Sequence, residues 1–210
     1  MRYLTTILLC LAALLPLTAQ NTAVTAQKAS VTPQNADQTA RAEVLLETTE
    51  GNIRIALYNE TPRHRDNFLK LVESHFYDSL LFHRVIPSFM IQAGDPDSRH
   101  AEPGAMLGEG DLPYQLEPEI VPALRHRYGS VAAAREGDDV NPGHLSSACQ
   151  FYIVTRKSGT PHLDGAYTVF GEVTEGMDVA NRIQRHIRDD DDRPVHDVRI
   201  LRATVLRKSE

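Results

Sequence analysis

The sequence predicts a mainly β domain, an antiparallel barrel covered by helices. Short runs of β-branched and aliphatic residues recur along the chain, whereas only two segments carry apolar residues at helical spacing. Strands and helices do not alternate as they do in a doubly wound parallel sheet, so the antiparallel barrel is favoured. The predicted strands are residues 43–48, 52–57, 81–85, 89–93, 129–134, 150–154, 168–173 and 198–206.

The first two strands are predicted to form a hairpin. Residues 52–57 place an apolar side chain at every second position, which is typical of a strand with one buried face. Glu50-Gly51 lies between the two runs, and this pair predicts a tight turn.

Two helices are predicted, with a long loop between strands. Thr61 suits the N-cap of the first helix and Pro62 its first helical position. The second helix is predicted over residues 177–187, and the Gly- and Pro-rich segment 96–128 is predicted to be mostly loop. The first helix has its apolar face at Phe68, Leu71, Val72 and His75, and the second at residues 177, 179, 180, 183 and 187.

Composition excludes several classes of function. The formal net charge is −6, whereas a nucleic-acid-binding domain is expected to be basic, so no nucleic-acid partner is expected. Two cysteines exclude a disulfide scaffold and a four-cysteine zinc site. The chain has no Gly-rich phosphate loop, HExxH or GxSxG motif, so no cofactor is expected. The nine histidines lack paired ligand spacing, and the acidic run 189–192 lacks the glycine turn of an EF-hand, so no metal is expected.

The N-terminal residues predict export. Residues 1–20 contain a basic start and an apolar run that is too short to span about 30 Å of hydrocarbon, which is typical of a secretory signal peptide. Cys10 lies inside the apolar run rather than after it, so lipid anchoring is not expected. Residues 21–41 are predicted to be a flexible leader, and residues 42–207 a single domain. We expect a monomer in the periplasm or the medium, without stable membrane insertion, with net charge −7 and Cys149 as its only thiol.

One stretch carries a specific motif: Phe82-His83-Arg84-Val85-Ile86-Pro87-Ser88-Phe89-Met90-Ile91-Gln92-Ala93-Gly94-Asp95. Two further blocks follow in order, at residues 147–153 and at 163–165 with 169–171. Together they resemble the cyclophilin-type peptidyl-prolyl isomerases, from about residue 44 to residue 206. The resemblance implies a closed antiparallel eight-stranded β-barrel capped by two α-helices. It also implies an enzyme that accelerates rotation about X-Pro bonds in polypeptides and assists protein folding.

Strand periodicity independently indicates a binding surface. Residues two apart in a strand share a face, so Met90 is expected to point with Gln92, and Gln150 with Tyr152. The residues between them are expected to point into the barrel. Strict alternation would also send Phe89 inward, but the turn just before it can redirect its side chain, and the resemblance places it in the binding surface.

The chemistry of amide rotation explains why such a surface needs a cation. Rotation breaks conjugation at a cost of about 18–20 kcal/mol, and the twisted prolyl nitrogen gains a free lone pair. A fixed donor to that nitrogen stabilises the transition state more than the ground state. The resemblance assigns this catalytic role to Arg84 and places Gln92 on the carbonyl side. The residues implied to grip the proline ring are Phe89, Met90, Tyr152 and Leu163.

The resemblance implies further substrate contacts. Ala134 and Arg135 match a strand end whose backbone contacts the peptide in relatives, and Gln150 and Tyr167 match binding positions. His162 stands where many eukaryotic relatives have a Trp that contacts ciclosporin, and this chain has no Trp, so a weak response to ciclosporin is expected.

Two other functions remain open. The first is a non-catalytic, chaperone-like binder of proline-containing segments, which substitution of Arg84 distinguishes from an isomerase. The second is a metal-dependent hydrolase that uses the scattered His and Asp residues, which a chelator would inhibit.

Overall fold

The computed structural model describes residues 40–208. The predicted signal peptide (residues 1–20), Cys10 and residues 21–39 of the predicted leader lie outside the described residues. Arg41, the last residue of that leader, contacts the domain, because its Nη1 lies 2.6 Å from Glu172 Oε1.

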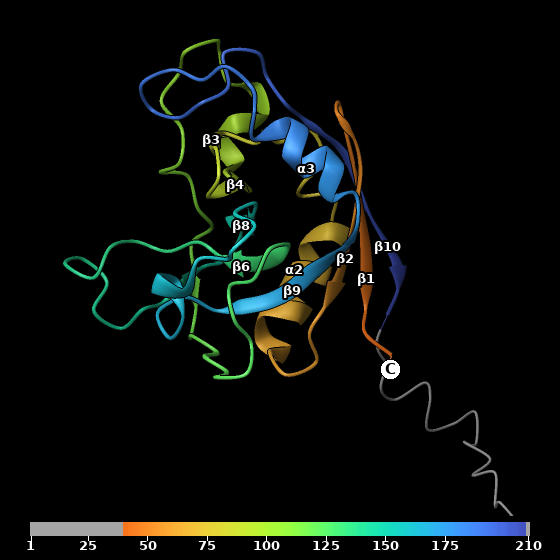
Figure 1. Ribbon diagram of the computed structural model, residues 1–210, viewed down its shortest axis with the longest axis vertical. Helices are drawn as coiled ribbons and strands as arrows, with labels where there is room; N and C mark the ends of the chain where they lie inside the picture. The colour runs from red at the N-terminus through yellow and green to blue at the C-terminus, as the bar shows by residue number, and fades with distance from the viewer. Residues whose placement is uncertain (1–39, 209–210) are drawn as a thin grey trace, which may run out of the picture. The chain divides into compact units, whose positions relative to one another are not determined.

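Eight strands form one antiparallel sheet in the order β10-β1-β2-β9-β6-β8-β4-β3 (Figure 1). The strands are β1 (Glu43–Thr48), β2 (Gly51–Leu57), β3 (Arg84–Ile86), β4 (Met90–Ala93), β6 (Ser130–Ala133), β8 (Phe151–Val154), β9 (Val169–Glu175) and β10 (Ile200–Arg207). The predicted hairpin of the first two strands is confirmed. A separate pair that the sequence did not predict joins β5 (Gln115–Leu116) to β7 (Ser146–Ser147).

The prediction of a closed barrel is wrong, because the sheet is an open, curled half-barrel. Its edges are β3 and β10, and no ladder of hydrogen bonds joins them. The segment before β3 still contacts the start of β10: Leu81 forms a bridge with Arg199, and the N–H groups of Ser79 and Phe82 donate to the carbonyls of Ile200 and Val198, both at 2.8 Å. Closure fails because β3 has only three residues and the outward N–H of Val85 is already bonded to the carbonyl of Asp192, at 2.8 Å.

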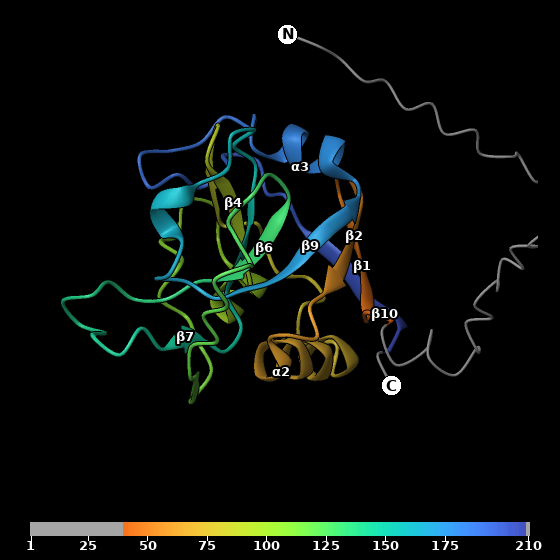
Figure 2. The same cartoon turned by 60° about the horizontal axis from the view of Figure 1, so that its bottom comes forward.

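Two α-helices, α2 (Pro62–Glu73) and α3 (Met177–Ile183), lie at opposite ends of the curled sheet, as Figure 2 shows, and both contribute buried residues to the inner core. Two short 3₁₀ helices, η1 (Pro96–His100) and η2 (Pro161–Leu163), lie in the connections. Within residues 40–208, no helix combines the length and the apolar content that crossing a bilayer requires.

Helix α2 begins where the sequence predicts, but a distant residue caps it. Thr61 occupies the N-cap position without a capping bond from its side chain. The carboxylate of Glu119 instead accepts the free N–H groups of Arg63 and His64, at 3.1 and 3.0 Å.

Helix α3 is shorter than predicted, because it ends at Ile183 rather than at residue 187. Beyond the helix, the carbonyl of Ile187 accepts the N–H of Val195, which turns the chain back on itself. Ile187 is 78% exposed, so it does not continue the buried apolar face of the helix.

The inner face of the sheet holds the main hydrophobic core. The Phe68 ring from α2 lies 5.3 Å from that of Phe151 and 5.4 Å from that of Phe170, between ring centroids. Fully burying an aliphatic or aromatic side chain contributes about 1.5–3 kcal/mol. The largest fully buried side chains are Tyr77, Phe82, Phe151, Leu46, Ile53, Ile55, Leu57, Leu80, Leu81, Ile91, Ile153 and Ile183.

A second, smaller apolar cluster lies on the other face of β4, β6, β8 and β9. Because side chains alternate along a strand, Ile91 and Ile153 point to the inner core while their neighbours Met90 and Tyr152 point outward. The buried members of this cluster are Tyr58, Met90, Ala132, Tyr152, Val154 and Val169. It forms the floor of the candidate site.

Candidate active site

Strand register places three candidate residues in one row across the sheet. Arg84 on β3 is paired with Gln92 on β4, and Gln92 is paired with Tyr152 on β8. Directly opposed residues on neighbouring strands point to the same face, so the guanidinium, the amide and the phenol ring lie side by side. The predicted pairing of Met90 with Gln92 on one face agrees with this register.

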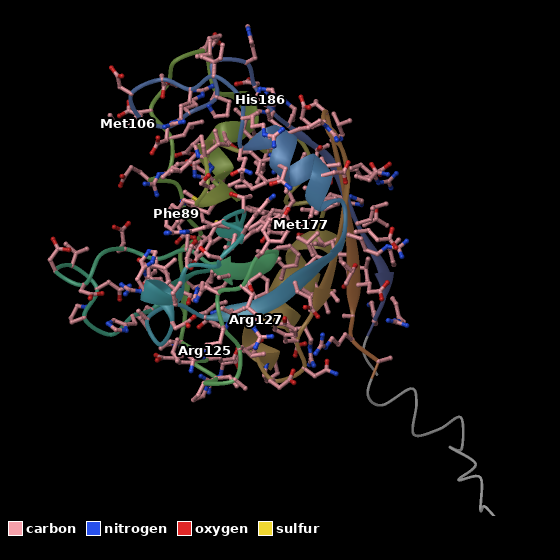
Figure 3. The ribbon with its side chains drawn as sticks, viewed as in Figure 1. Phe89, Met106, Arg125, Arg127, Met177 and His186 are labelled. Carbon is pink, nitrogen blue, oxygen red and sulfur yellow. The ribbon has the colours of Figure 1, made fainter. Side chains whose placement is uncertain are left out.

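Phe89 reaches the outer face through a turn. Ser88 has a positive φ of 57°, and the Phe89 N–H is bonded to the Ile86 carbonyl at 3.1 Å, which closes the turn between β3 and β4. Phe89 therefore leaves the strand alternation and packs against the outer cluster, as predicted. Figure 3 shows Phe89 beside β3 and β4, on the side away from β1 and β10.

These side chains surround a pocket of about 100 Å³, called the proline pocket below. It is lined by Arg84, Phe89, Met90, Gln92, Arg135, Tyr152, Leu163 and Tyr167. The pocket therefore combines an apolar and aromatic wall with two guanidinium groups and one amide.

The orientation of the Gln92 amide follows from its neighbours. Gln150 donates through Nε2 to the carbonyls of Gly108 and Gly110, at 2.8 and 2.7 Å, because carbonyls can only accept. Its Oε1 therefore faces Gln92 and accepts from Gln92 Nε2 at 2.9 Å. Among the described residues no bond occupies the Oε1 or the second N–H of Gln92, so both are left for a ligand.

Arg84 is held loosely at the rim. Its side chain is 46% exposed, and its Nε lies 3.7 Å from Asp192 Oδ2, the one carboxylate within 4 Å among the described residues. Its neighbour His83 is buried, and burial lowers the pKa of His83 to about 4, so the imidazole beside the guanidinium is neutral at pH 7.

Comparison with known proteins decides the family. Residues 43–205 match the model of the family described as "Cyclophilin type peptidyl-prolyl cis-trans isomerase/CLD". The chain belongs to the cyclophilin-type peptidyl-prolyl cis-trans isomerases. Its predicted enzymatic activity, peptidyl-prolyl cis-trans isomerisation, is confirmed on this basis.

Individual cyclophilin-type relatives agree over nearly their whole length. "Peptidyl-prolyl cis-trans isomerase-like 1" of Aspergillus fumigatus is 35% identical over 169 residues, which is 80% of this chain and 98% of the relative. The protein of the same name from Neurospora crassa is 37% identical, over 80% and 96%. A solved cyclophilin-type isomerase from Cryptosporidium parvum is 26% identical with a TM-score of 0.67, over 80% of this chain and 99% of that structure.

The rim of this cyclophilin's proline pocket carries two further predicted residues. His162 on η2 stacks on Phe89, with ring centroids 5.8 Å apart. Tyr167 meets the Tyr152 ring edge to face at 6.0 Å. Leu163, between them in sequence, lines the pocket itself.

Arg135 lines the pocket with its side chain, and its contact with a bound peptide stays a prediction. Its guanidinium lies 4.4 Å over the Tyr167 ring and 2.7 Å from Asp138 Oδ1. Its Nε also donates to the Ala166 carbonyl at 2.8 Å. These contacts occupy the guanidinium, so Arg135 acts as a wall of the pocket rather than as a free charge.

Ala134 is not among the residues that line the pocket. Its N–H donates to the Gln150 carbonyl at 3.0 Å, and its carbonyl accepts from the Ser147 N–H at 2.9 Å. The N–H of Ala134 is therefore already bonded within the domain. Its role as a peptide contact stays a prediction.

A larger cavity of about 510 Å³ adjoins the proline pocket and shares Gln92 and Arg135 with it. The other lining residues are Gly108, Glu109, Asp111, Leu112, Pro113, Tyr114, Gln115, Glu136, Ser147 and Gln150. Most of them belong to the segment 96–128, which the sequence predicted only as loop. That segment thus forms part of the surface beside the site.

Sequence reasoning missed three residues around the pocket: His126, Asp164 and Asp192. Asp164 lies in the motif block 163–165, directly after Leu163, so a position near the pocket could have been inferred from the sequence. Its partner His126, however, is 38 residues away in sequence. Asp192 belongs to an acidic run that reads as a solvated loop. None of the three has a local pattern that indicates its contact.

Within the described part of the chain, Cys149 and the histidines do not form a metal site. Within residues 40–208, no group of three or more His, Cys, Asp or Glu side chains is arranged to hold a metal ion. Burial raises the pKa of the Cys149 thiol, and its hydrogen bond to Asp111 adds to this, so the thiol stays protonated at pH 7.

Proposed function

We propose that the proline pocket is where this isomerase binds the proline of an X-Pro bond, with Arg84 as the catalytic group. The observation that carries this proposal is the pairing of Arg84 with Gln92 beside an aromatic pocket of about 100 Å³. The compact, apolar ring of proline fits such a wall, and the two polar groups lie next to each other on paired strands.

Arg84 has the chemistry that amide rotation requires. Its guanidinium is always charged and presents rigid N–H donors. When the amide twists, the prolyl nitrogen gains a lone pair that can accept from one of these donors. This hydrogen bond strengthens only as the bond rotates, so it lowers the barrier rather than merely increasing affinity. No bond is made or broken, and no proton is transferred.

Gln92 fixes the other side of the reacting amide. The chain of hydrogen bonds from Gly108 and Gly110 through Gln150 holds its amide in one orientation. Its free polar atoms then meet the peptide backbone while the ring stays in the pocket. Rotation about the X-Pro bond thereby occurs between two held ends.

The proposed substrates are proline-containing segments of polypeptides. A relative from Cryptosporidium parvum, 26% identical with a TM-score of 0.66, was solved in the presence of the dipeptide Ala-Pro, which supports this class. The adjoining cavity of about 510 Å³ leaves room for residues that flank the proline. Unfolded chains and exposed loops present such segments.

The experiment compares wild type with Arg84→Ala and Arg84→Lys. A protease-coupled assay on a blocked Ala-Ala-Pro-Phe peptide gives kcat/KM, and calorimetry gives the dissociation constant. Arg84→Ala is expected to lower kcat/KM by about 10²–10³, the range for loss of a donor to a developing charge, with little change in affinity. Arg84→Lys keeps the charge but lacks the planar guanidinium, so its kcat/KM is expected to lie between those of wild type and Arg84→Ala.

Arg202→Ala is the matched control, because Arg202 is an exposed arginine on the outer part of β10. It removes the same charge and is expected to leave both values unchanged. If Arg84→Ala isomerises the peptide as fast as wild type, Arg84 is not the catalytic group. If wild type binds the peptide without accelerating rotation, the domain is a proline-binding chaperone instead.

We further propose that the chain is exported and acts as a monomer. The apolar run in residues 1–20 and its polar end support export. N-terminal sequencing of the protein from its host, together with native mass spectrometry, tests both points. A chain that keeps Met1, or a stable dimer mass, would contradict the respective proposal.

A further inference from the structure

Behind the proline pocket, three polar side chains form a continuous hydrogen-bonded chain. His126 Nε2 lies 2.9 Å from the Tyr152 hydroxyl, and His126 Nδ1 lies 2.9 Å from Asp164 Oδ1. The His126 side chain is fully buried, and the side chain of Asp164 is 14% exposed. Tyr152 is buried and belongs to the wall of the pocket. Nothing in the proposed mechanism uses His126.

The direction of the hydrogen bonds follows from the carboxylate. An ionised Asp164 can only accept, so His126 carries its proton on Nδ1 and donates it to Asp164. Nε2 then has a free lone pair and accepts the Tyr152 O–H. Burial lowers the pKa of His126, opposed by its bond to Asp164, so the imidazole stays neutral at pH 7 and this arrangement holds.

Asp164 is itself held from several sides. Its Oδ1 also accepts the backbone N–H of His126 at 2.9 Å, and its Oδ2 lies 3.1 Å from Arg125 Nη1. These donors keep the pKa of Asp164 below its usual value, although burial alone would raise it. The Arg125 side chain is 58% exposed, so it is the solvent-facing end of this group. The carboxylate is therefore a fixed anchor for the imidazole.

The chain joins two walls of the pocket that are far apart in sequence. Tyr152 lies on β8, whereas Asp164 directly follows Leu163 at the end of η2. The carbonyl of His126 also accepts the N–H of Thr160, at 2.8 Å, just before η2. His126 thus holds the segment that carries His162 and Leu163 at a set distance from the Tyr152 ring.

From this juxtaposition we propose that His126 is a positioning residue, which ties the Tyr152 wall of the proline pocket to its η2 wall and so sets the width of the pocket before substrate binds. The inference rests on the proposed function, because it concerns the same pocket. The His126 and Tyr152 rings are nearly parallel, at 11°, and Tyr167 closes the group edge to face against both. A phenylalanine at position 152 would lack the hydroxyl that this arrangement requires.

The expected effect is on substrate affinity rather than on turnover. Arg84 and Gln92 lie on β3 and β4, whereas within residues 40–208 the hydrogen bonds of the His126 side chain go to Tyr152 on β8 and to Asp164. Freeing one or two side chains that must be ordered again on binding weakens affinity by about three- to tenfold. We therefore expect KM and the dissociation constant for the blocked Ala-Ala-Pro-Phe peptide to rise by that factor, with kcat within about twofold of wild type.

The experiment uses the whole domain with Tyr152→Phe, His126→Leu and the double variant. Tyr152→Phe removes one oxygen atom and is expected to fold, so the test does not depend on His126→Leu alone. Because removing both partners leaves no unpaired buried group, the double variant is expected to weaken binding no more than either single change. Independently, ¹⁵N spectra of wild type are expected to show a protonated Nδ1 and an unprotonated Nε2 on His126.

His64→Leu is the matched control. His64 is another buried histidine with a carboxylate partner, Glu119 Oε2 at 2.7 Å from its Nδ1, but it lies on α2 and lines no part of the proline pocket. It is expected to lower the melting temperature and leave the dissociation constant unchanged.

Three results would count against these proposals. If the variants at 126 and 152 lower only the melting temperature, as His64→Leu does, the positioning role is overturned while the proposed function stands. A proton on Nε2 of His126 would overturn it as well. If wild type does not bind the peptide, the proposed function itself fails.

Discussion

His83 should account for a distinct part of the acid destabilisation of the domain. Both ring nitrogens of His83 are buried and have no hydrogen-bond partner among the described residues. Burial lowers the pKa of His83 from 6.5 to about 4, although the nearby Asp95 carboxylate opposes this shift. The perturbation we consider is His83→Leu, which removes the titration and keeps the site apolar.

The sign and size follow from proton linkage. Between pH 6.5 and pH 4 the unfolded chain binds a proton at His83 and the folded chain does not, so protonation favours unfolding as the pH falls. At about 1.4 kcal/mol per pH unit, the gap between these two pKa values corresponds to about 3 kcal/mol of folding free energy. This stability is fully present above pH 6.5 and is lost as the pH falls towards 4.

Urea unfolding at pH 7, 5.5 and 4 measures this contribution. The difference in unfolding free energy between pH 7 and pH 4 should be smaller in His83→Leu than in wild type by about 3 kcal/mol, with equal m-values. Burial also lowers the pKa values of His64 and His126, but wild type and His83→Leu both contain these two histidines, so their effect cancels in the comparison. An identical loss of stability in the two proteins would refute the assignment to His83.

Three further outcomes are expected. Gly94→Ala should destabilise the domain by about 3 kcal/mol in urea unfolding, because Gly94 has a φ of +105° and a Cβ there would lie 2.2 Å from the Cys149 carbonyl oxygen; an unchanged midpoint would contradict this. Gln150→Leu should lower kcat/KM for a prolyl peptide by about tenfold with an intact fold, because it frees the Gln92 amide that Gln150 holds at 2.9 Å; activity equal to wild type would show that Gln92 needs no such support. Ciclosporin should inhibit only weakly, since His162 on Phe89 takes the rim where many relatives have Trp; a nanomolar inhibition constant would contradict this.

The sequence was sufficient where structure follows from short-range periodicity. Alternation along residues 89–93 and 150–154 placed Met90, Gln92 and Tyr152 on one face, and strand register joins them in the structure. The positive φ of Ser88 accounts for the departure of Phe89 from that alternation. These features depend on the backbone geometry of a few neighbouring residues.

Features that depend on distant partners were not predictable in this way. Whether the sheet closes depends on the Val85–Asp192 bond between segments more than one hundred residues apart. The contact of His126 with Tyr152 spans 26 residues and joins a loop to a strand. No local sequence pattern indicates either contact. The residues around His126 do not distinguish it from any other histidine in a loop, and Asp192 is one of four adjacent aspartates.

The most direct test of the role of Arg84 is to measure how fast the X-Pro bond of a peptide rotates while it exchanges on and off the protein. Two-dimensional NMR exchange spectroscopy, with wild type or Arg84→Ala at a small fraction of the concentration of a prolyl peptide, detects cis-trans interconversion without a protease. Wild type should give strong exchange peaks, and Arg84→Ala should give almost none. The NMR signals of Phe89 and Met90 in Arg84→Ala should still change their chemical shifts when the peptide is added, which shows that the variant binds it. Equal exchange in the two proteins would contradict the central claim that Arg84 lowers the barrier in this pocket.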